Sequence, residues 1–308
     1  MIQNGQTRWG RIGAAIALLA LGIAGYWQFF LRRPIGEGPA GPKVDRSLFR
    51  QPWSNREVLL VGLGDSITAG FGASPGKSYF QRLFQNPADE FPDLHCVSLS
   101  AVFPRARATN LAISGSTSPQ HLRSQIPRLP HQPTNVLGIV VLTTGGNDLI
   151  HNYGRSAPVE DAMYGATWAQ AEPWIARFAE RLEALVTRIT EAFPGGSHIF
   201  LATIYDPTDG LGDLTNAGLP AWPDALRIHD AYNRLLADCA ARHANVHLVD
   251  IRSGFLGHGI HCTQFWREHY DAHDPHYWYL YNLEDPNDRG YDALRRLFLN
   301  AMAKVLGV

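Results

Sequence analysis

The sequence has little net charge and few cysteines. Its 308 residues carry 27 lysines and arginines against 28 aspartates and glutamates, and charged residues make up only 18% of the chain. A nucleic-acid binder normally shows a basic excess or a basic stripe, so we expect no nucleic-acid partner. Three cysteines are too few for a disulfide scaffold, although one bridge is possible, and no C-x-x-C pair suggests a zinc knuckle.

The remaining composition is that of an ordinary globular protein. Hydrophobic residues make up 45% of the chain, which excludes a disordered protein and provides enough material for a core. The length allows one large domain or two small ones. The unusual count is histidine, of which there are 13.

One long apolar run lies near the N-terminus. Residues 12–31 are apolar apart from Gln28, and twenty helical residues rise about 30 Å, the thickness of the hydrocarbon core of a bilayer. Tyr26 and Trp27 lie near its far end, as interfacial aromatic residues do, and arginines flank both ends. We predict an uncleaved N-terminal membrane anchor over residues 1–33. A cleaved signal peptide is the main alternative, and a buried core helix is a remote one.

The rest of the chain alternates between strand and helix patterns. Residues 34–56 begin with a Gly/Pro-rich stretch and are predicted as a linker, followed by one domain over residues 57–308. Helical stripes occur within 174–193, 226–239 and 294–302. The β-type runs are 57–62, 108–113, 136–142, 197–204 and 245–251. Several of these runs are apolar on both faces, so the pattern predicts an α/β domain with a buried parallel sheet.

Three of the predicted strands lead into glycine-containing segments with polar groups. These segments read Gly64-Asp65-Ser66, Ser114-Gly115 and Gly146-Asn147-Asp148. In a parallel α/β sheet, ligands bind outside the carboxyl ends of the strands. A serine hydroxyl, a backbone N–H and an amide that converge there supply a nucleophile and oxyanion donors. Taken singly, the serine is explained as a helix cap and the Asn-Asp pair as an Asx turn.

With these three blocks in register, the sequence resembles the SGNH/GDSL hydrolase family over roughly residues 57–302. The resemblance implies a flavodoxin-like three-layer sandwich and an ester hydrolase that works through an acyl-enzyme, with no cofactor and no metal. It implies Ser66 as the nucleophile, and an oxyanion hole made by the N–H groups of Ser66 and Gly115 and the amide of Asn147. The support residues it implies are Asp65, Thr68, Asp148 and Asn287.

The last block of the family departs from its pattern in this sequence. That block normally reads D-x-x-H before P-N and G-Y. The P-N and G-Y pairs are present, but Asp285 stands in place of the histidine and Asn282 in place of the aspartate. A carboxylate with its usual pKa of about 4 is a poor acceptor for the serine proton. Either the surroundings of Asp285 raise its pKa, or a histidine enters from elsewhere.

A cluster of histidines follows the strand that ends at Ile251. Its members are His258, His261, His269, His273 and His276. Flanking glycines let a loop carry His258 close to Ser66, so we predict His258 as the general base, with Asp285 as its partner or substitute.

Other interpretations of these histidines stay open. For His269, His273 and His276, ordinary exposed surface histidines are the preferred interpretation. The i, i+4 pair His269/His273 suggests a metal site, but no H-E-x-x-H spacing occurs and we predict no metal. The literal D-x-x-H of Asp148 and His151 overlaps the third block and is kept as a minor alternative.

The sequence thus predicts a membrane-tethered serine hydrolase of carboxylic esters, whose substrate is a small-molecule, lipid or glycan ester. The family resemblance favours an extracytoplasmic domain, or a secreted one if the anchor is cleaved. The aromatic stretch 277–281 is expected to pack in the core, or else to line a substrate subsite. The alternatives are a catalytically silent binding protein on the same fold, because the Asp-His pair is lost, and an acyltransferase.

Overall fold

The computed structural model describes residues 3–307 and is built around a parallel sheet. Its five strands are β1 (Glu57–Leu63), β2 (Ala106–Asn110), β3 (Val136–Leu142), β4 (Ser197–Ala202) and β5 (Val246–Val249). They lie in the order β2-β1-β3-β4-β5, with every neighbouring pair parallel. This is the flavodoxin-like strand order, which confirms the predicted fold class.

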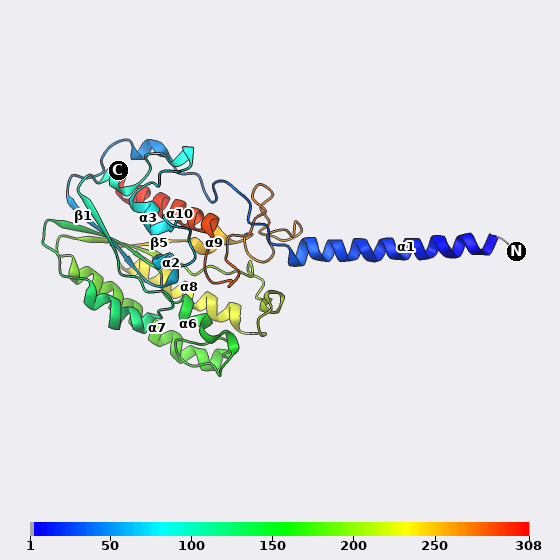
Figure 1. Cartoon of the computed structure of the whole chain (residues 1–308). Helices are drawn as coiled ribbons and strands as arrows, with labels where there is room; N and C mark the ends of the chain where they lie inside the picture. The colour runs from blue at the N-terminus through cyan, green and yellow to red at the C-terminus, as the bar shows by residue number, and fades with distance from the viewer. Residues whose placement is uncertain (1–2, 308) are drawn as a thin grey trace.

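Helices cover both faces of the sheet (Figure 1). The α-helices are α1 (Gln3–Tyr26), α2 (Ser66–Ala69), α3 (Tyr79–Phe84), α4 (Leu99–Val102), α5 (Ser118–Gln120), α6 (Gly146–Ile150), α7 (Trp168–Ala192), α8 (Ala225–Arg242), α9 (Ile251–Phe255) and α10 (Asp288–Leu306). Short 3₁₀ or π turns are η1 (Trp27–Leu31), η2 (Arg46–Phe49), η3 (Pro92–Leu94), η4 (His121–Gln125), η5 (Ile126–Arg128), η6 (His151–Gly154) and η7 (Leu214–Ala217).

The alternation of side chains along each strand divides the core into two halves. On β3, Ile139 and Val141 pack in the cluster that includes α3 and α10. Val140 and Leu142 pack in the cluster that includes α7 and α8. All seven residues of β3 are buried, as expected for a central parallel strand.

The predicted run 108–113 is only partly a strand. β2 lies at the edge of the sheet, contains mostly polar or exposed residues, and ends at Asn110. The chain then forms the loop 111–117. The Leu111 amide still donates to the Gly62 carbonyl of β1, while the side chain of Asn110 accepts a hydrogen bond from the backbone amide of Ala112 (3.1 Å). This loop places Gly115 beside the end of β1.

The N-terminal apolar helix projects from the domain as α1 and continues as the π-helical turn η1 (Figure 1). Among the described residues, Trp9–Leu31 is the one helical stretch long and apolar enough to cross a membrane, with a mean hydropathy of 1.8. The three cysteines, which permitted one bridge, are all free: Cys239 and Cys262 are buried and Cys96 is exposed.

The segment predicted as a linker packs on the domain. Its glycines provide turns with positive φ, while Ala40, Val44 and Phe49 are buried in the core. The backbone amide of Tyr277 donates to the carbonyl of Pro34 at 2.7 Å. Residues 34–56 therefore connect the helix to the domain as a folded strap, because their few apolar side chains find places in the core.

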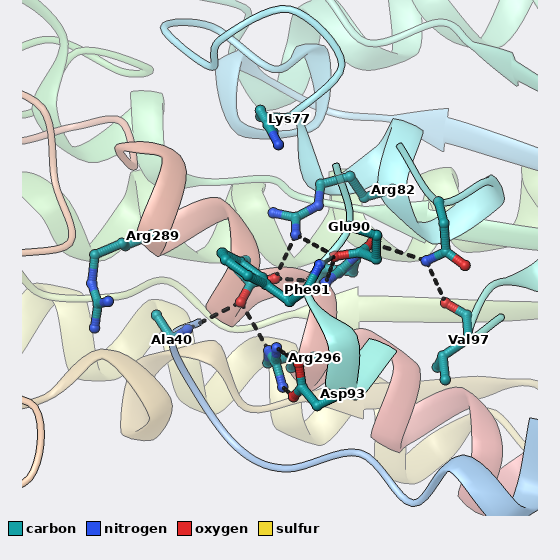
Figure 2. Close-up of polar contacts among 12 residues, drawn as sticks. Ala40, Lys77, Arg82, Glu90, Phe91, Asp93, Val97, Arg289 and Arg296 are labelled. Atoms are coloured by element: carbon teal, nitrogen blue, oxygen red, sulfur yellow. Dashed lines mark hydrogen bonds and ion pairs between the residues drawn. The ribbon is translucent and has the colours of Figure 1, made fainter. Parts of the chain in front are cut away.

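A buried network of charges joins this strap to α3, to the turn at Glu90 and to α10 (Figure 2). Asp292 on α10 accepts hydrogen bonds from the Ala40 amide (3.0 Å) and the Arg296 guanidinium (2.9 Å), and it lies 3.0 Å from Arg82 of α3. The Glu90 carboxylate forms ion pairs with Arg82, at 2.9 Å, and with Arg295. The side chains of Arg82, Glu90, Asp292, Arg295 and Arg296 are each no more than 2% exposed.

The charges in this network stabilise one another. Burial alone would raise the pKa of Glu90, but the hydrogen bond from Arg295 and the charges of Arg295 and Arg82 lower it to about 2. Because the folded-state pKa lies below the ordinary value of 4.5, the contribution of Glu90 to stability is present above that value and is lost as the pH falls toward 2.

We expect the Glu90→Gln substitution to lower the free energy of unfolding by about 3–5 kcal/mol, because it leaves buried arginines without their counter-charge. Chemical unfolding of the full chain in mild detergent measures this change. The matched control is Asp89→Asn, which removes the surface partner of Lys77 and should leave stability unchanged, since the Asp89 side chain is 72% exposed. Equal stabilities for wild type and Glu90→Gln would contradict the assigned role of the network.

Candidate active site

The turn after β1 carries Ser66 at the start of α2. Gly64 has φ of 130°, and a Cβ atom on it would lie 2.2 Å from the carbonyl oxygen of Thr143, so a glycine is required there. Asp65 caps α2, because its Oδ1 accepts hydrogen bonds from the Ile67 amide (3.1 Å) and the Thr143 hydroxyl (2.7 Å). The predicted support residue Asp65 thus fixes the direction in which Ser66 leaves the strand.

A buried chain of hydroxyl groups continues behind this turn. The Thr68 hydroxyl lies 2.9 Å from the Thr143 hydroxyl and 2.7 Å from that of Tyr79. Burial raises the pKa of Asp65 to about 6, and the hydrogen bond from Thr143 opposes that rise. The negative charge of nearby Asp285 raises it further. Thr68 and Asp65 thus belong, with Thr143, to one hydrogen-bonded group behind the turn that carries Ser66.

The loop that carries Gly115 is tied directly to the same turn. The side chain of Gln125 accepts from the Gly64 amide (2.8 Å) and donates to the Gly64 carbonyl (2.7 Å). The Ser116 hydroxyl donates to that carbonyl at 3.0 Å and lies 3.0 Å from Nε2 of His121. Burial lowers the pKa of His121 to about 4, so this ring is neutral at pH 7.

Gln125 and His121 are not among the site residues predicted from the sequence. The available signal was a glutamine and a histidine within a short helical segment directly after the second block, but such residues are more often exposed. Their burial follows from their contacts with Gly64, Ser116 and Thr144, which come from three other segments.

Of the three predicted oxyanion donors, Ser66 and Asn147 line one cavity, whereas Gly115 is not among the residues that line it. The Asn147 amide donates one hydrogen to the Ser116 carbonyl (2.9 Å), which leaves its second hydrogen free, and Asn147 lines the same cavity as Ser66. Over residues 3–307, the backbone N–H groups of Ser66 and Gly115 make no hydrogen bond. Asp148 is fully buried and accepts from the backbone amide of Ser118 at 2.9 Å, which holds the 118 region against α6.

Asp285 lies next to Ser66. Its Oδ2 accepts a hydrogen bond from the Asn282 amide (2.7 Å), while its buried Oδ1 has no partner within the described chain. Burial raises the pKa of Asp285, and the nearby Ser66 hydroxyl and the Asn282 amide oppose that rise. The Ser66 hydroxyl is thus close enough to stabilise the carboxylate. The two groups do not form a hydrogen bond of ordinary geometry, and Oδ1 of Asp285 stays unpaired.

Asn287 holds this segment in place. Its Oδ1 accepts from the amides of Arg289 and Gly290, both at 3.0 Å, and so caps α10. Its amide donates to the carbonyl of Tyr277 at 2.7 Å. Asn287, two residues after Asp285, thereby joins the start of α10 to the buried aromatic segment.

The structure does not bring His258 and Ser66 together. The His258 ring stacks on Trp278 with a centroid distance of 3.4 Å, and its Nδ1 lies 3.2 Å from the His276 carbonyl. It lines a cavity formed with Asp271, Asp274 and Arg289, whose lining does not include Ser66. Burial lowers the pKa of His258.

The glycines around His258 serve another purpose than the one expected. The backbone amides of Gly257 and Gly259 donate to the Asp209 carboxylate at 2.9 and 2.8 Å, and the His261 amide joins them at 3.0 Å. A Cβ atom on Gly257 would lie 1.9 Å from the carbonyl oxygen of His269. The glycines permit close packing around Asp209, and this packing directs His258 toward Trp278.

Two other histidines of the cluster have carboxylate partners. His261 pairs with Asp213 at 2.9 Å, and His276 pairs with Asp274 at 2.5 Å. Within residues 3–307, the group with metal-like spacing is instead Glu183, Cys239 and His243, and Glu183 already pairs with Arg242 there.

Ser66 opens into a mostly apolar cavity of about 110 Å³, called here the Ser66 cavity. Its apolar lining includes Leu149, Ile150, Tyr153, Tyr164, Ile204, Leu214, Leu219, Trp222 and Leu226. Glu284 also lines it, and burial together with the charge of Asp285 raises the pKa of Glu284 to about 8. The one histidine in this lining is His229 of α8, which lies 3.2 Å from the Tyr205 carbonyl.

The aromatic stretch 277–281 does not line the Ser66 cavity. Tyr277, Trp278 and Tyr279 are buried in the core under α10, and Tyr281 is exposed. Packing is therefore the role of the three buried rings.

Comparison with known proteins matches residues 63–293 to the GDSL-like Lipase/Acylhydrolase family. No curated protein sequence matches the chain. Among solved structures, an extracellular lipase from Streptomyces rimosus is 19% identical, with 79% of this chain and 99% of that chain covered and a TM-score of 0.47. An acetylxylan esterase from Geobacillus stearothermophilus, crystallised as a catalytic mutant, is 20% identical, with coverages of 79% and 93% and a TM-score of 0.48.

The matched family region extends from the end of β1 into α10 and includes all three glycine-containing blocks, together with Asp285 and Asn287. It covers well over half of the chain. The protein therefore belongs to the GDSL-like lipase/acylhydrolase family and, at the level of that family, is an ester hydrolase.

Proposed function

We propose that this protein hydrolyses carboxylic esters through an acyl-enzyme on Ser66, and that Asp285 acts as the general base. Two observations carry the proposal: the Asp285 carboxyl lies within reach of the Ser66 hydroxyl, and its buried Oδ1 has no hydrogen-bond partner in the described chain. Asn282 holds the other carboxyl oxygen. The Asn282–Asp285 pair thus occupies the positions of the family's Asp-His pair.

The proposed reaction has two halves. Ser66 Oγ attacks the ester carbonyl as its proton passes to Asp285, and the N–H groups of Ser66 and Gly115 and the amide of Asn147 stabilise the oxyanion. The C–O bond to the leaving alcohol then breaks, and that alcohol takes the proton. In the second half, water attacks the acyl-enzyme, transfers a proton to Asp285, and releases the carboxylic acid as Ser66 regains its hydrogen.

A carboxylate is suited to this role only if its environment makes it a stronger base than usual. General-base catalysis is most efficient when the pKa of the base lies near the operating pH. Burial raises the pKa of Asp285, and Asp65 and Glu284 lie close enough to interact with its charge. Desolvation therefore makes Asp285 a stronger base than an exposed carboxylate.

The lining of the Ser66 cavity favours an alkyl acyl group. Apolar side chains dominate it, among them Leu149, Leu214 and Trp222. A site for a sugar needs several hydrogen-bonding groups to replace water, whereas an alkyl chain is bound by apolar surface. We infer that the acyl side of the ester occupies this cavity.

We expect Asp285→Asn to lower kcat/KM by about 100- to 10,000-fold, because it removes the proton acceptor but keeps the size of the side chain. Ser66→Ala should abolish turnover and labelling by a fluorophosphonate. Hydrolysis of p-nitrophenyl butyrate by the purified full chain measures both effects. The matched control is His258→Ala, which should retain activity. Loss of activity in His258→Ala with full activity in Asp285→Asn would reverse the assignment, and no labelling of the wild type at any pH would support a silent binding protein.

The pH dependence should have two limbs. Activity should rise with pH as Asp285 ionises, with its inflection above the ordinary carboxyl value of 3.8. It should fall above about pH 8, because ionised Glu284 then places a negative charge near the oxyanion. Glu284→Gln should abolish the alkaline fall and keep the acid limb. An unchanged alkaline limb in Glu284→Gln would refute the role given to that residue.

The family's usual pair can be restored by the double substitution Asn282→Asp/Asp285→His. In that variant the acid inflection of the activity should move toward about pH 6.5.

We infer that α1 is retained as a membrane anchor and is not removed as a signal peptide. The end of its helical run is part of the folded domain: the side chains of Thr263 and Gln264 donate to the carbonyls of Gln28 (3.2 Å) and Phe29 (2.9 Å). Cleavage after the apolar run would remove these partners and expose the rings packed on them.

The retained anchor predicts that the protein stays in the membrane fraction after an alkaline carbonate wash and is released by detergent. Its intact mass should include the residues of α1. A fusion of residues 34–308 to a cleavable signal peptide provides the secreted control. A mature protein that is soluble and lacks the first 33 residues would contradict this inference.

A further inference from the structure

An exposed group of aromatic residues surrounds the base of α1. Phe29 and Phe30 of η1 lie 5.0 and 6.3 Å from Trp266, measured between ring centroids, and Phe29 lies 5.7 Å from Phe265. Phe265 is 63% exposed and Trp266 is 47% exposed. Trp27 and Phe30 are exposed as well. We call Trp27, Phe30, Phe265 and Trp266 the aromatic patch.

The aromatic patch has the composition and the location of a membrane-interface surface. It combines two segments more than 230 residues apart in the chain, and hydrogen bonds from Thr263 and Gln264 to η1 hold them together. Arg32 lies over the Trp27 ring at 5.6 Å. Tryptophan beside arginine at the end of a long apolar helix is the pattern found at the boundary between lipid and water.

The patch lies at the same edge of the domain as the Ser66 cavity. Helix α1 leaves the domain on the side of the loops that follow the strands (Figure 1). Arg33 donates to the carbonyl of Asn216 at 3.4 Å, and Asn216 lies on η7, whose Leu214 lines the cavity. His261, two residues before Thr263, pairs with Asp213 at the start of η7. One wall of the cavity is thus attached both to the anchor and to the patch-bearing loop.

We propose that the aromatic patch inserts into the interfacial region of the bilayer that α1 spans, and that it holds the domain with the Ser66 cavity facing the lipid surface. The substrate is then an ester with an alkyl acyl chain that enters from the membrane. The substrate part of this proposal rests on the proposed esterase function, whereas the contact between patch and bilayer does not. The bilayer is favoured as the occupant because the patch is continuous with the apolar helix and is flanked by Arg32 and Arg33.

The contact between patch and bilayer is tested by fluorescence, without reference to catalysis. The full chain and its W266F variant are reconstituted in phosphatidylcholine vesicles with or without lipids brominated near the carbonyl end of the acyl chain. The emission that wild type has and W266F lacks belongs to Trp266, and we expect bromination to quench it. A difference emission that bromination leaves unchanged would overturn the proposal.

The delivery of substrate is tested by two esters in the same vesicles. F265S/W266S should hydrolyse a long-chain ester embedded in the vesicle about tenfold more slowly than wild type, because two apolar anchors are lost from the interface. It should hydrolyse soluble p-nitrophenyl butyrate at the wild-type rate, which also shows that the domain is folded. The control is L48S, a substitution of an exposed leucine on η2.

The outcomes of these measurements separate the two proposals. Slower hydrolysis of the embedded ester alone supports the membrane-facing cavity, and equal rates on that ester for wild type and F265S/W266S would overturn it. A wild-type chain inactive on both esters would refute the esterase proposal, and the quenching of Trp266 would then decide the contact with the bilayer.

Discussion

The buried ion network around Glu90 and Asp292 connects the parts of this molecule that the function requires. Its arginines and carboxylates come from α3, the 90–93 turn and α10, and Asp292 also binds the strap at Ala40. Because each charge is removed from water, none can lose its partners without a large free-energy cost, and the elements that carry them must stay together. The network thereby fixes α10, whose Asn287 cap holds the segment of Asp285 beside Ser66.

In the candidate active site, burial is the main cause of the raised pKa values of the carboxyl groups. Three carboxyl groups, those of Asp65, Glu284 and Asp285, lie near Ser66, and burial raises the pKa of each. Mutual repulsion acts in the same direction between Asp285 and its two neighbours. A family member that lacks the usual histidine at this position thus has a carboxylate whose surroundings make it more basic, with Asn282 to orient it.

Sequence analysis predicted those features that depend on local pattern. The runs at 57–62 and 136–142 are strands because apolar β-type residues continue on both faces. The first and third glycine-containing blocks follow β1 and β3 as expected, whereas Gly115 lies in the loop after β2, which ends earlier than predicted. The role of Ser66 remains a proposal, but its place at the end of β1 was predictable, since only glycine fits at position 64. The alternative in which a raised pKa makes Asp285 the base was also visible in the substituted D-x-x-H block.

Sequence alone thus determined the order of the elements, the fold class and the positions of the three blocks, because these depend on neighbours close in the chain. Tertiary structure decided which side chain meets Ser66. The loop of His258 turns away because Asp209, about fifty residues earlier, binds its backbone amides. Asp285 meets Ser66 because the distant charges of Arg82 and Glu90 hold α10 in place. Tertiary packing also joined the aromatic residues of η1 to the loop at 265–266. Such contacts link residues far apart in the chain, and no local pattern specifies them.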